Sequence, residues 1–556
     1  MIGIEKKIKI EKFMNFGIKN IESKIESLLK QNNFDTKVHF QYSSYNNFDI
    51  QCNASLQIKK IEVLESLKQD IMDDLQKFTE IEDFEITDNG FINIKFSNKH
   101  LLSLLKTENY EVENKVHILF DYGGPNIGKA LHVGHLRTLN IGRSLYKINK
   151  FAGNKVTSDV HFGDWGMPVS QIIAYLIYKE IDVNAVDYDD LETIYPSAVK
   201  LSKGDEEFGK LCQHISRELN LQNNEYFEKW KIIYKISIDQ IKSLFVKLQH
   251  SFDLFYGESD VINETNKVVE KAKKDGLVKI DDGALISTEE SDPPIIITKA
   301  DGSYLYMTTD LGTVYFRESQ NTYDKYVYVV DSRQSEHFSQ LFKTVKHFNL
   351  SEKEFNHIGY GTVNGKDGKP LKTREGGVYK LVDLYSDVKN LLKSENLNEE
   401  DLNKLTNSVL TFSDLISNRK QNYIFDIEKY VDINGKTAVY LQYSQVRAKK
   451  LLDEFNSQNE IFEIDNLNTH ERSLVMLITK FSYYFKLSLD KNEPHHLAEY
   501  GYNLSSSFNS FYSNNKIFSD DTDPQTKYKR MYIVKEFHKT LINIFYCLGI
   551  EPVDKM

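Results

Sequence analysis

Cysteine is scarce in this chain, and long apolar runs are missing. The three cysteines among its 556 residues, Cys52, Cys212 and Cys547, form no Cys-x-x-Cys pair. This pattern argues against zinc ribbons and disulfide frameworks and is typical of a reducing compartment. No stretch approaches the roughly twenty apolar residues that cross a bilayer, and residues 1–7 lack a signal-peptide core. We therefore expect a cytoplasmic protein without membrane contact.

Positive charge is not in excess either. The formal net charge is −11, whereas nucleic-acid phosphates must be met by cations, so any RNA-binding surface must be local. The sequence has no repeat of fixed period and no heptad seam, and a monomer is the expected state. A chain of 556 residues is too long for one hydrophobic core, which predicts about two to four domains.

The motif His132-Val133-Gly134-His135 stands at the predicted start of a helix. A strand-like run at residues 116–122 and a loop of small residues at 123–131 precede it. Free backbone N–H groups and the helix dipole make such a place an anion site. The two histidines share one helix face and can donate hydrogen bonds to phosphate, and Gly134 would let a flat ring approach the backbone. The alternative is that the pair only caps the helix or decorates the surface.

The following residues extend this motif to a βαβ unit. Gly153 is a plausible helix end, residues 155–160 form a second strand-like run, and His161-Phe162-Gly163-Asp164-Trp165-Gly166 follows it. Strand, glycine-containing loop, helix and strand in this order are what a nucleotide-binding unit requires. We therefore predict a site for a nucleoside triphosphate.

The pattern Pro125-Asn126-x-x-Lys129-x-x-His132-x-Gly134-His135-Leu136-Arg137 resembles that of the arginyl-tRNA synthetases, a family of class I aminoacyl-tRNA synthetases. The likeness continues, in order, at residues 163–166, 304–310, 331–334, 365–374, 423–426 and 442–443. It implies an ATP-dependent arginine–tRNA ligase that forms arginyl-adenylate and pyrophosphate and then charges the 3′-terminal adenosine of tRNA(Arg). It also implies that tRNA is needed for activation.

The expected fold class is α/β with three domains. Residues 1–112 form an N-terminal α/β domain, with helices near 18–29 and 61–78 and a hairpin at 84–96 that turns at Asn89-Gly90. Residues 113–400 form a split Rossmann-like catalytic domain whose parallel sheet resumes at residues 295–298 and 326–330, after an insertion at about 167–290. Residues 401–556 form a helical domain. The resemblance implies that the first domain contacts the tRNA elbow and the last the anticodon.

The resemblance also assigns the phosphate chemistry. Adenylate formation needs positioning and charge neutralisation rather than a covalent nucleophile. His132 and His135 would stabilise developing charge, while Lys129 would reach the phosphates. The usual class I lysine loop is replaced by residues 369–374, Lys-Pro-Leu-Lys-Thr-Arg, in which Lys372 is the first choice for the leaving pyrophosphate. Pro125, Asn126 and Gly134 complete the expected ATP site, and ATP is expected with Mg²⁺, without a tightly bound protein metal.

Arginine recognition should use carboxylates, because a guanidinium is always charged and accepts bidentate pairing. Asp121 and Asp310 fall where the family carries these acids. Without the resemblance, Asp310 would more simply be a helix N-cap before Leu311. Relatives more often have serine at Gly123-Gly124. The further residues expected at arginine are Asn126, Tyr306 and Gln334.

Two regions are expected to contact tRNA. In the first, residues 48–53 resemble a recurring family motif, and a plain buried strand is the alternative. In the second, tyrosines near cations could stack on splayed anticodon bases, and inward packing of an amphipathic helix is the alternative. The expected contact residues are Phe48, Gln51, Asn53, Tyr440, Gln442, Tyr443 and Arg447, and a later cluster contains Lys527, Lys529 and Arg530.

Two rival functions stay open at this point. One is a class I synthetase for another amino acid: a lysine-specific site would share the carboxylates, but residues 306–310 and the Lys372-Thr373-Arg374 loop favour arginine. A non-catalytic tRNA-binding paralogue would usually have lost a phosphate-binding histidine or lysine, whereas this chain has His132, His135 and Lys129.

Overall fold

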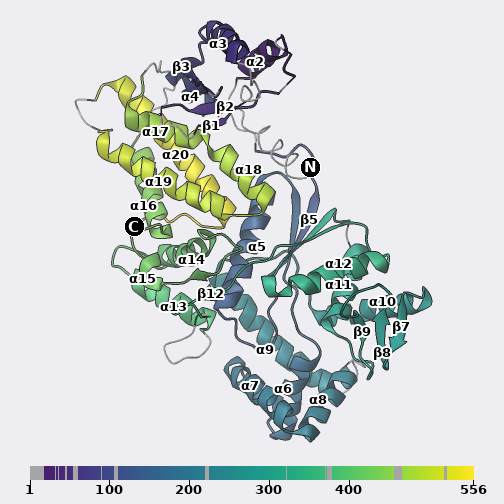
Figure 1. Ribbon diagram of the computed structural model, residues 1–556. Coiled ribbons are helices and arrows are strands. Elements are labelled where there is room, and N and C mark those ends of the chain that lie inside the picture. Colours follow the sequence, from purple (N-terminus) through teal and green to yellow (C-terminus); the bar gives the residue numbers. More distant parts are fainter. Residues whose placement is uncertain are drawn as a thin grey trace. The chain divides into compact units, whose positions relative to one another are not determined.

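The computed structural model describes residues 18–31, 33–35, 37–43, 47–53, 61–88, 90–105, 110–219, 225–320, 322–369, 371, 379–455, 466–518 and 522–556. The chain divides into two compact units (Figure 1). The central unit is Glu111–Val431 with Leu548–Ile550, and the terminal unit is Met1–Tyr110, Asp432–Cys547 and Glu551–Met556. None of the described helices is long and apolar enough to cross a membrane.

The central unit is built on a parallel four-stranded sheet with the order β11-β10-β5-β6. From β5 (His117–Tyr122) the chain passes through α5 (Val133–Phe151) to β6 (Lys155–Asp159), and from β10 (Lys325–Val329) through a second helix to β11 (Glu354–His357). The two halves leave the β5–β10 pair in opposite directions. The carboxyl ends of these two strands are therefore the topological switch point at which open α/β sheets bind ligands. The predicted split parallel sheet is confirmed.

Helices cover both faces of this sheet (Figure 1). On one face, α11 (Tyr306–Gln320) and α12 (Ser335–His347) share a hydrophobic core with Leu119 of β5 and Tyr326 of β10. On the other face, α5 packs against β5, β6 and α14 (Glu399–Leu415). Because β5 is buried on both sides, its sequence is an apolar run instead of an alternating pattern.

The segment between β6 and β10 adds a group of helices and a small antiparallel sheet. The prediction that residues 295–298 belong to the parallel sheet is wrong, because β9 (Ile296–Thr298) pairs antiparallel with β8 in a sheet of order β7-β8-β9. A short apolar run predicts a strand but does not identify its partner. The other elements here are α6 (Met167–Tyr178), α7 (Tyr188–Gly204), α8 (Glu206–Leu219), α9 (Glu225–Lys247), α10 (Ile262–Lys274), β7 (Val278–Asp281) and β8 (Ala284–Ser287).

Short elements complete the central unit. β12 (Val363–Asn364) pairs in parallel with β13 (Tyr423–Ile424). The remaining helices are α13 (Leu381–Leu392) and α15 (Ile427–Tyr430), with 3-10 turns at Val183–Ala185, Glu258–Val261 and Ser332–Gln334.

The terminal unit contains an antiparallel sheet with the order β1-β2-β4-β3. β3 (Ile81–Ile86) and β4 (Ile92–Phe96) form the predicted hairpin, in which Ile86 lies opposite Ile92. Asn89 lies outside the described residues. The other elements are α2 (Lys19–Gln31), β1 (Gln41–Tyr42), β2 (Ile50–Cys52), α3 (Ile61–Leu75), α4 (Asn98–Leu104), α16 (Ala438–Glu454), α17 (Thr469–Thr479), α18 (Phe481–Lys491), α19 (His495–Asn514) and α20 (Pro524–Leu548).

A buried ion pair joins α5 to α14 in the central unit. Arg137 Nε lies 2.9 Å from Asp414 Oδ1, and the two side chains are 1% and 0% exposed. Arg137 also donates to the carbonyl oxygens of Gly361 and Gln421, at 2.9 Å each. The guanidinium therefore connects the first turns of α5 to the segments beside β12 and β13.

The substitution Asp414→Asn is expected to destabilise the central unit by about 3–5 kcal/mol, because the Arg137 charge would stay buried without its counter-charge. Both tryptophans of the chain, Trp165 and Trp230, lie in this unit, so their fluorescence during urea unfolding reports on it. Glu354→Gln breaks the more exposed Lys325–Glu354 pair and is the control, with an expected effect of about 0–1 kcal/mol. Equal shifts of the two unfolding curves would contradict this prediction.

Candidate active site

A cavity of about 450 Å³ opens at the carboxyl ends of β5 and β10. We call it the site cavity. Its walls come from the residues after both strands, the start of α5, the loop after β6 and the first turns of α11 and α12. It occupies the switch point of the sheet, where the direction of the crossovers leaves the strand ends uncovered.

The site cavity brings together most of the residues expected from the sequence. Pro125 is buried beside it, and its carbonyl oxygen accepts a hydrogen bond from Gly163 N at 3.1 Å. Lys129 is not part of the lining, since its ammonium group lies 4.4 Å from the centre of the Tyr195 ring. Lys372 lies outside the described residues. The expected residues that line the cavity are Asp121, Asn126, His132, Gly134, His135, Tyr306, Asp310 and Gln334.

Both imidazoles cap the start of α5. His132 is the N-cap residue, and its Nδ1 accepts a hydrogen bond from Gly134 N at 3.0 Å. His135 Nδ1 accepts one from His132 N at 3.1 Å. The same Nδ1 also lies 3.3 Å from the His132 carbonyl oxygen, but that oxygen already accepts from His135 N at 2.8 Å. Both histidines therefore do cap the helix.

Capping leaves each histidine with one ring nitrogen that takes no part in the cap, because only Nδ1 of each ring accepts a capping hydrogen bond. A nitrogen that accepts a hydrogen bond carries no proton, so each neutral ring must carry its proton on Nε2. Burial and the neighbouring His132 and Lys129 lower the pKa of His135 to about 3. Burial and the cations Arg333 and Lys129 lower the pKa of His132. The cavity thus contains two neutral rings whose Nε2–H groups can donate to an anion.

Gly134 has a steric role at this helix start. A Cβ atom at Gly134 would lie 2.7 Å from His132 Cε1, closer than carbon atoms pack. The His132 ring therefore needs glycine at this position to fold back onto the Gly134 amide. Gly124 is tighter still, because a Cβ there would lie 2.2 Å from the His161 carbonyl oxygen.

Two acids meet at the opposite wall of the cavity. Asp310 lies in the second turn of α11, which begins at Tyr306, so the alternative that it is a helix N-cap is wrong. Its Oδ2 atom accepts a hydrogen bond from His337 Nε2 at 2.6 Å. Glu258 is 8% exposed, and burial, together with Asp164 and Asp310, raises the pKa of its carboxyl group to about 8. Two carboxyl groups with little solvent favour a cation between them.

The expected role of Asp121 needs correction. Its Oδ2 atom lies 2.6 Å from Arg317 NH2, and the same nitrogen lies 2.6 Å from Asp159 Oδ2. Arg317 is 2% exposed and belongs to α11. The guanidinium that Asp121 binds is therefore one from its own chain. Asp310 and Glu258 also line the cavity.

Glu258, His337 and Arg333 are among the cavity residues that the sequence did not single out. Glu258 lies in a 3-10 turn that no local pattern distinguishes, and His337 is identified only by its contact with Asp310. Arg333 could have been found, because it belongs to the family-like run 331–334. It pairs with Asp331 through two nitrogens, at 2.9 and 2.8 Å, and its side chain is 80% exposed.

A second cavity of about 310 Å³ adjoins the first on the other side of the helix start. His132, Gly134 and Arg333 line both cavities. The walls of the second are mainly backbone and apolar groups from Val133, Gly361, Val363 and Leu371. Such walls fit a flat aromatic ring beside the anion site.

The residues expected to contact tRNA lie in the terminal unit. Gln442 is 0% exposed, and its amide donates to Glu551 O at 2.7 Å and accepts from Val553 N at 3.1 Å. It holds the last residues of the chain and is not accessible to RNA, which corrects that expectation. Arg447 lies between the rings of Tyr443 and Tyr512, 4.4 Å from the centre of each.

The β2 region follows the buried-strand alternative more closely. Gln51 is 9% exposed in the centre of the antiparallel sheet, and Asp49 forms an ion pair with Arg472 of α17 at 2.5 Å. Phe48 is half-buried and Asn53 is exposed, which leaves these two side chains with accessible surface.

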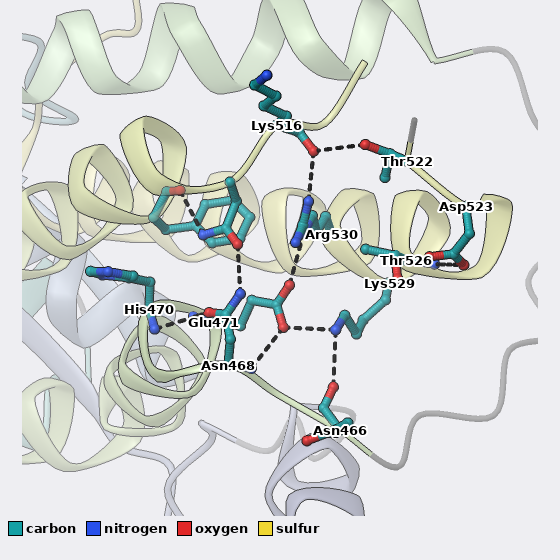
Figure 2. Close-up of polar contacts among 12 residues, drawn as sticks. Asn466, Asn468, His470, Glu471, Lys516, Thr522, Asp523, Thr526, Lys529 and Arg530 are labelled. Atoms are coloured by element: carbon teal, nitrogen blue, oxygen red, sulfur yellow. Dashed lines mark hydrogen bonds and ion pairs between the residues drawn. The ribbon is translucent and has the colours of Figure 1, made fainter. Parts of the chain in front are cut away.

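Lys529 and Arg530, two of the cations expected near the C-terminus, form ion pairs inside the terminal unit. Figure 2 shows Lys529 and Arg530 converging on Glu471, which is 0% exposed. Lys529 Nζ lies 2.7 Å from Glu471 Oε2, and Arg530 Nε lies 2.9 Å from Oε1. Arg530 also donates to the Lys516 carbonyl oxygen at 2.6 Å. Two of the three cations of the expected cluster are thus paired with a buried acid of the same unit.

The chain is similar to known proteins over nearly its whole length. Residues 98–427 match the family described as tRNA synthetases class I (R), catalytic domain. Residues 441–556 match the DALR anticodon binding domain, and residues 17–96 match the arginyl tRNA synthetase N terminal domain.

Individual relatives and solved structures agree with these matches. The chain is 33% identical to an arginine–tRNA ligase of Francisella tularensis, over 91% of this chain and 94% of that protein. It is 32% identical to that of Alkaliphilus oremlandii, over 98% and 100%. Structures of arginyl-tRNA synthetases from Plasmodium falciparum and Thermus thermophilus share the fold, with TM-scores of 0.77 at 22% and 18% identity, over 97% of this chain and 99% of each.

Nitrogen-15 NMR of labelled histidine is expected to show His135 protonated at Nε2 and unchanged between about pH 5 and 8, where an ordinary histidine titrates. The reason is that Nδ1 accepts the His132 amide while burial disfavours the charged ring. The variant His135→Gln identifies the resonance by its loss. A proton on Nδ1, or a titration within this range, would disprove the assigned tautomer.

Proposed function

Since the chain belongs to the arginyl-tRNA synthetase family, we propose that its site cavity binds the arginine guanidinium beside Asp310 and Glu258 and ATP beside His132 and His135. The enzyme activates L-arginine with ATP to arginyl-adenylate and pyrophosphate, and then transfers arginine to the 3′-terminal adenosine of tRNA(Arg). The observation that carries the proposed roles is that two acids and two neutral imidazoles share one cavity.

The acidic wall is the proposed guanidinium site. Its Asp310 carboxylate is oriented by His337, which occupies Oδ2, so the other oxygen is the proposed contact for the substrate. Glu258 supplies the second carboxylate from a different element. Its raised pKa fits a group that awaits a cation, because a guanidinium would stabilise its charged form. Tyr306 would cover the side chain of arginine, while Asn126 and Gln334 would hold its α-amino and carboxylate groups.

The imidazole wall is the proposed phosphate site. In the activation step, a carboxylate oxygen of arginine attacks the α-phosphorus of ATP, and the bond to the bridging oxygen of pyrophosphate breaks. Negative charge grows on the phosphate oxygens and on the leaving group, so preorganised donors lower the barrier. The Nε2–H groups of His132 and His135 can supply such donors, and the amide dipoles at the start of α5 act in the same direction.

The triphosphate also needs cations. Arg333 lines both cavities and its side chain is largely exposed, which supports a contact with phosphate. Lys372 stays the proposed partner of the leaving pyrophosphate, and Lys129 would have to leave the Tyr195 ring to reach the phosphates. The second cavity is the proposed place of adenine, with Gly134 and Leu371 among its walls.

Magnesium is proposed to enter with ATP. In the described part of the chain, three metal-ligating side chains converge at Glu493, His495 and His496 of the terminal unit, and at no other place. We propose that the phosphate oxygens of ATP hold Mg²⁺ in the site cavity. Bound in this way, Mg²⁺ neutralises phosphate charge.

The proposed tRNA contacts follow the domains. Residues 1–112 would contact the tRNA elbow. Residues from 113 on, with the insertion near 167–290, would carry out catalysis, and the C-terminal helices would bind the anticodon.

Because α14 packs on α5 and the central unit runs to Val431, we propose that the anticodon-binding domain starts after Val431 instead of at residue 401. We also propose a cytoplasmic monomer. The proposed RNA contacts are Phe48, Asn53, Tyr440, Tyr443 and Arg447.

Replacing His132 by Asn separates its two roles, because the amide oxygen of Asn can cap α5 whereas the donor at the Nε2 position is lost. The rate of arginine-dependent ATP–pyrophosphate exchange should fall by about 10²–10³-fold, with the KM for ATP and the melting temperature nearly unchanged. His132→Ala should lose the same activity and, in addition, about 1 kcal/mol of stability. Exchange at the parent rate in either variant would refute the proposed role of His132.

Arginine identity depends on the acidic wall. Asp310→Asn should raise the KM for arginine by orders of magnitude, because a half-buried guanidinium would lose its counter-charge, while the KM for ATP moves little. ATP–pyrophosphate exchange with each amino acid, in the presence of tRNA, should occur with arginine alone in the parent enzyme. Exchange with another amino acid at a comparable rate would favour the rival synthetase, and no exchange would favour the non-catalytic paralogue.

Arginine binding should also release a proton below about pH 8. Glu258 is largely protonated at neutral pH in the empty site, since its pKa is about 8, and the guanidinium favours its charged form. The affinity for arginine should therefore rise as the pH increases towards 8 and then level off. Calorimetry in two buffers of different ionisation enthalpy measures the released proton. Glu258→Gln should bind arginine more weakly with no such pH dependence, and an unchanged pH profile in this variant would exclude Glu258 as the titrating group.

A further inference from the structure

The backbone around His132 is held by a segment from far along the chain. Val133 N donates to Tyr379 O at 3.1 Å, and Leu381 N donates to Leu131 O at 2.8 Å. These two bonds form an antiparallel bridge in which His132 lies opposite Lys380. The position of the His132 ring therefore depends on where the segment Tyr379–Leu381 is fixed.

Helix α7 contacts both strands of this bridge. The Glu192 carboxylate forms an ion pair with Lys380, and the Glu192 side chain is only 13% exposed. The Tyr188 hydroxyl donates to Lys129 O at 2.9 Å, and the Tyr195 ring lies below the Lys129 ammonium group. Tyr188, Glu192 and Tyr195 are spaced four and three residues apart and so share one face of α7. This face touches the chain both before His132 and opposite it.

The neighbouring helix α9 adds a third anchor on the same side. Gly128 N donates to Ser237 Oγ at 3.0 Å, and Ser237 is 0% exposed. Both α7 and α9 come from the segment inserted between β6 and β10. The loop from β5 to α5 is thus supported by helices that are not part of the parallel sheet.

We propose that Glu192 is a positioning residue for arginine activation: by holding Lys380 it fixes Tyr379–Leu381 against Leu131–Val133 and so sets the position of the His132 imidazole. This inference rests on the proposed catalytic role of His132. Leu381 is buried and begins α13, which holds one end of this segment, and the Glu192–Lys380 contact ties the residue opposite His132 to α7 as well. A displacement of about 1 Å at a reacting group can cost up to about 10²-fold in rate.

The expected effect is kinetic. An ion pair whose lysine is 43% exposed adds little to stability, so Glu192→Gln should leave the melting temperature close to that of the parent enzyme. The turnover number for ATP–pyrophosphate exchange should fall by about 10-fold or more, while the KM for arginine stays unchanged. The matched control is Glu354→Gln, which breaks the Lys325–Glu354 pair at the far ends of β10 and β11 and should leave the exchange rate unchanged.

Two double variants test the route of the effect, with the full-length enzyme, arginine, ATP and tRNA. Lys380→Met should cost as much as Glu192→Gln, and the two together no more than either alone, because both break one contact. In the His132→Asn background, Glu192→Gln should cause no further loss. A turnover number for Glu192→Gln equal to that of Glu354→Gln, or additive losses in either pair, would overturn the proposal.

The outcomes also separate this inference from the proposed function. If His132→Asn lowers activation while Glu192→Gln does not, only the positioning role fails. If Glu192→Gln lowers activation while His132→Asn does not, the role of His132 itself fails, and with it the route by which Glu192 would act.

Discussion

The parallel pairing of β5 with β10 is the constraint on which the site depends. It joins two halves of the chain that are separated by α6–α11, and it places their carboxyl ends side by side. Two acids, Asp121 of β5 and Asp159 of the neighbouring β6, lie at the carboxyl ends of their strands. Their charge is balanced by Arg317, which forms an ion pair with each of them. Arg317 belongs to α11, so the same ion pairs fix that helix over the sheet. Two turns earlier on α11, Asp310 then faces the site cavity.

The two ends of the cavity differ in charge because their surroundings differ. At the acidic wall, burial raises the pKa of Glu258 and leaves a carboxyl group that gains most when a cation arrives. At the start of α5, burial lowers the pKa of both histidines, and the capping bonds require Nδ1 of each ring as an acceptor. Neutral donors that are already oriented cost no reorganisation during the reaction. The capping bonds thus orient both rings in the way that their proposed role requires.

The segment inserted between β6 and β10 contributes to the position of the start of α5. Its helices α7 and α9 contact the loop that leads from β5 to α5, through Tyr188, Tyr195 and Ser237. Glu192 reaches the segment that bridges to His132 from the other side. These contacts add to the buried Ile127 and Leu131 of the loop itself in fixing where its backbone lies.

Much of the architecture could be predicted from local patterns. The run at residues 117–122, the helix after His132, its end before Gly153 and the hairpin at 81–96 all have short-range causes. Eight of the residues expected at the site from the sequence line the cavity. The predictions that were wrong concerned the interaction partners of particular residues. Residues 296–298 form a strand in another sheet, Asp121 forms an ion pair with Arg317, and Gln442 forms hydrogen bonds with residues 551 and 553. Glu258 and His337 were missed because each faces the cavity through a contact distant in sequence.

The sequence by itself determined the family, the order of the domains and the residue types at the proposed phosphate and guanidinium sites, because periodicity, turn residues and motifs are local properties of the chain. Only the tertiary structure decided which acids face the cavity, which histidine nitrogens are left to donate and which cations are already neutralised by Glu471. Those properties depend on burial and on pairing between distant residues, and the free energy of a charge depends on its partner far more than on its neighbours in sequence.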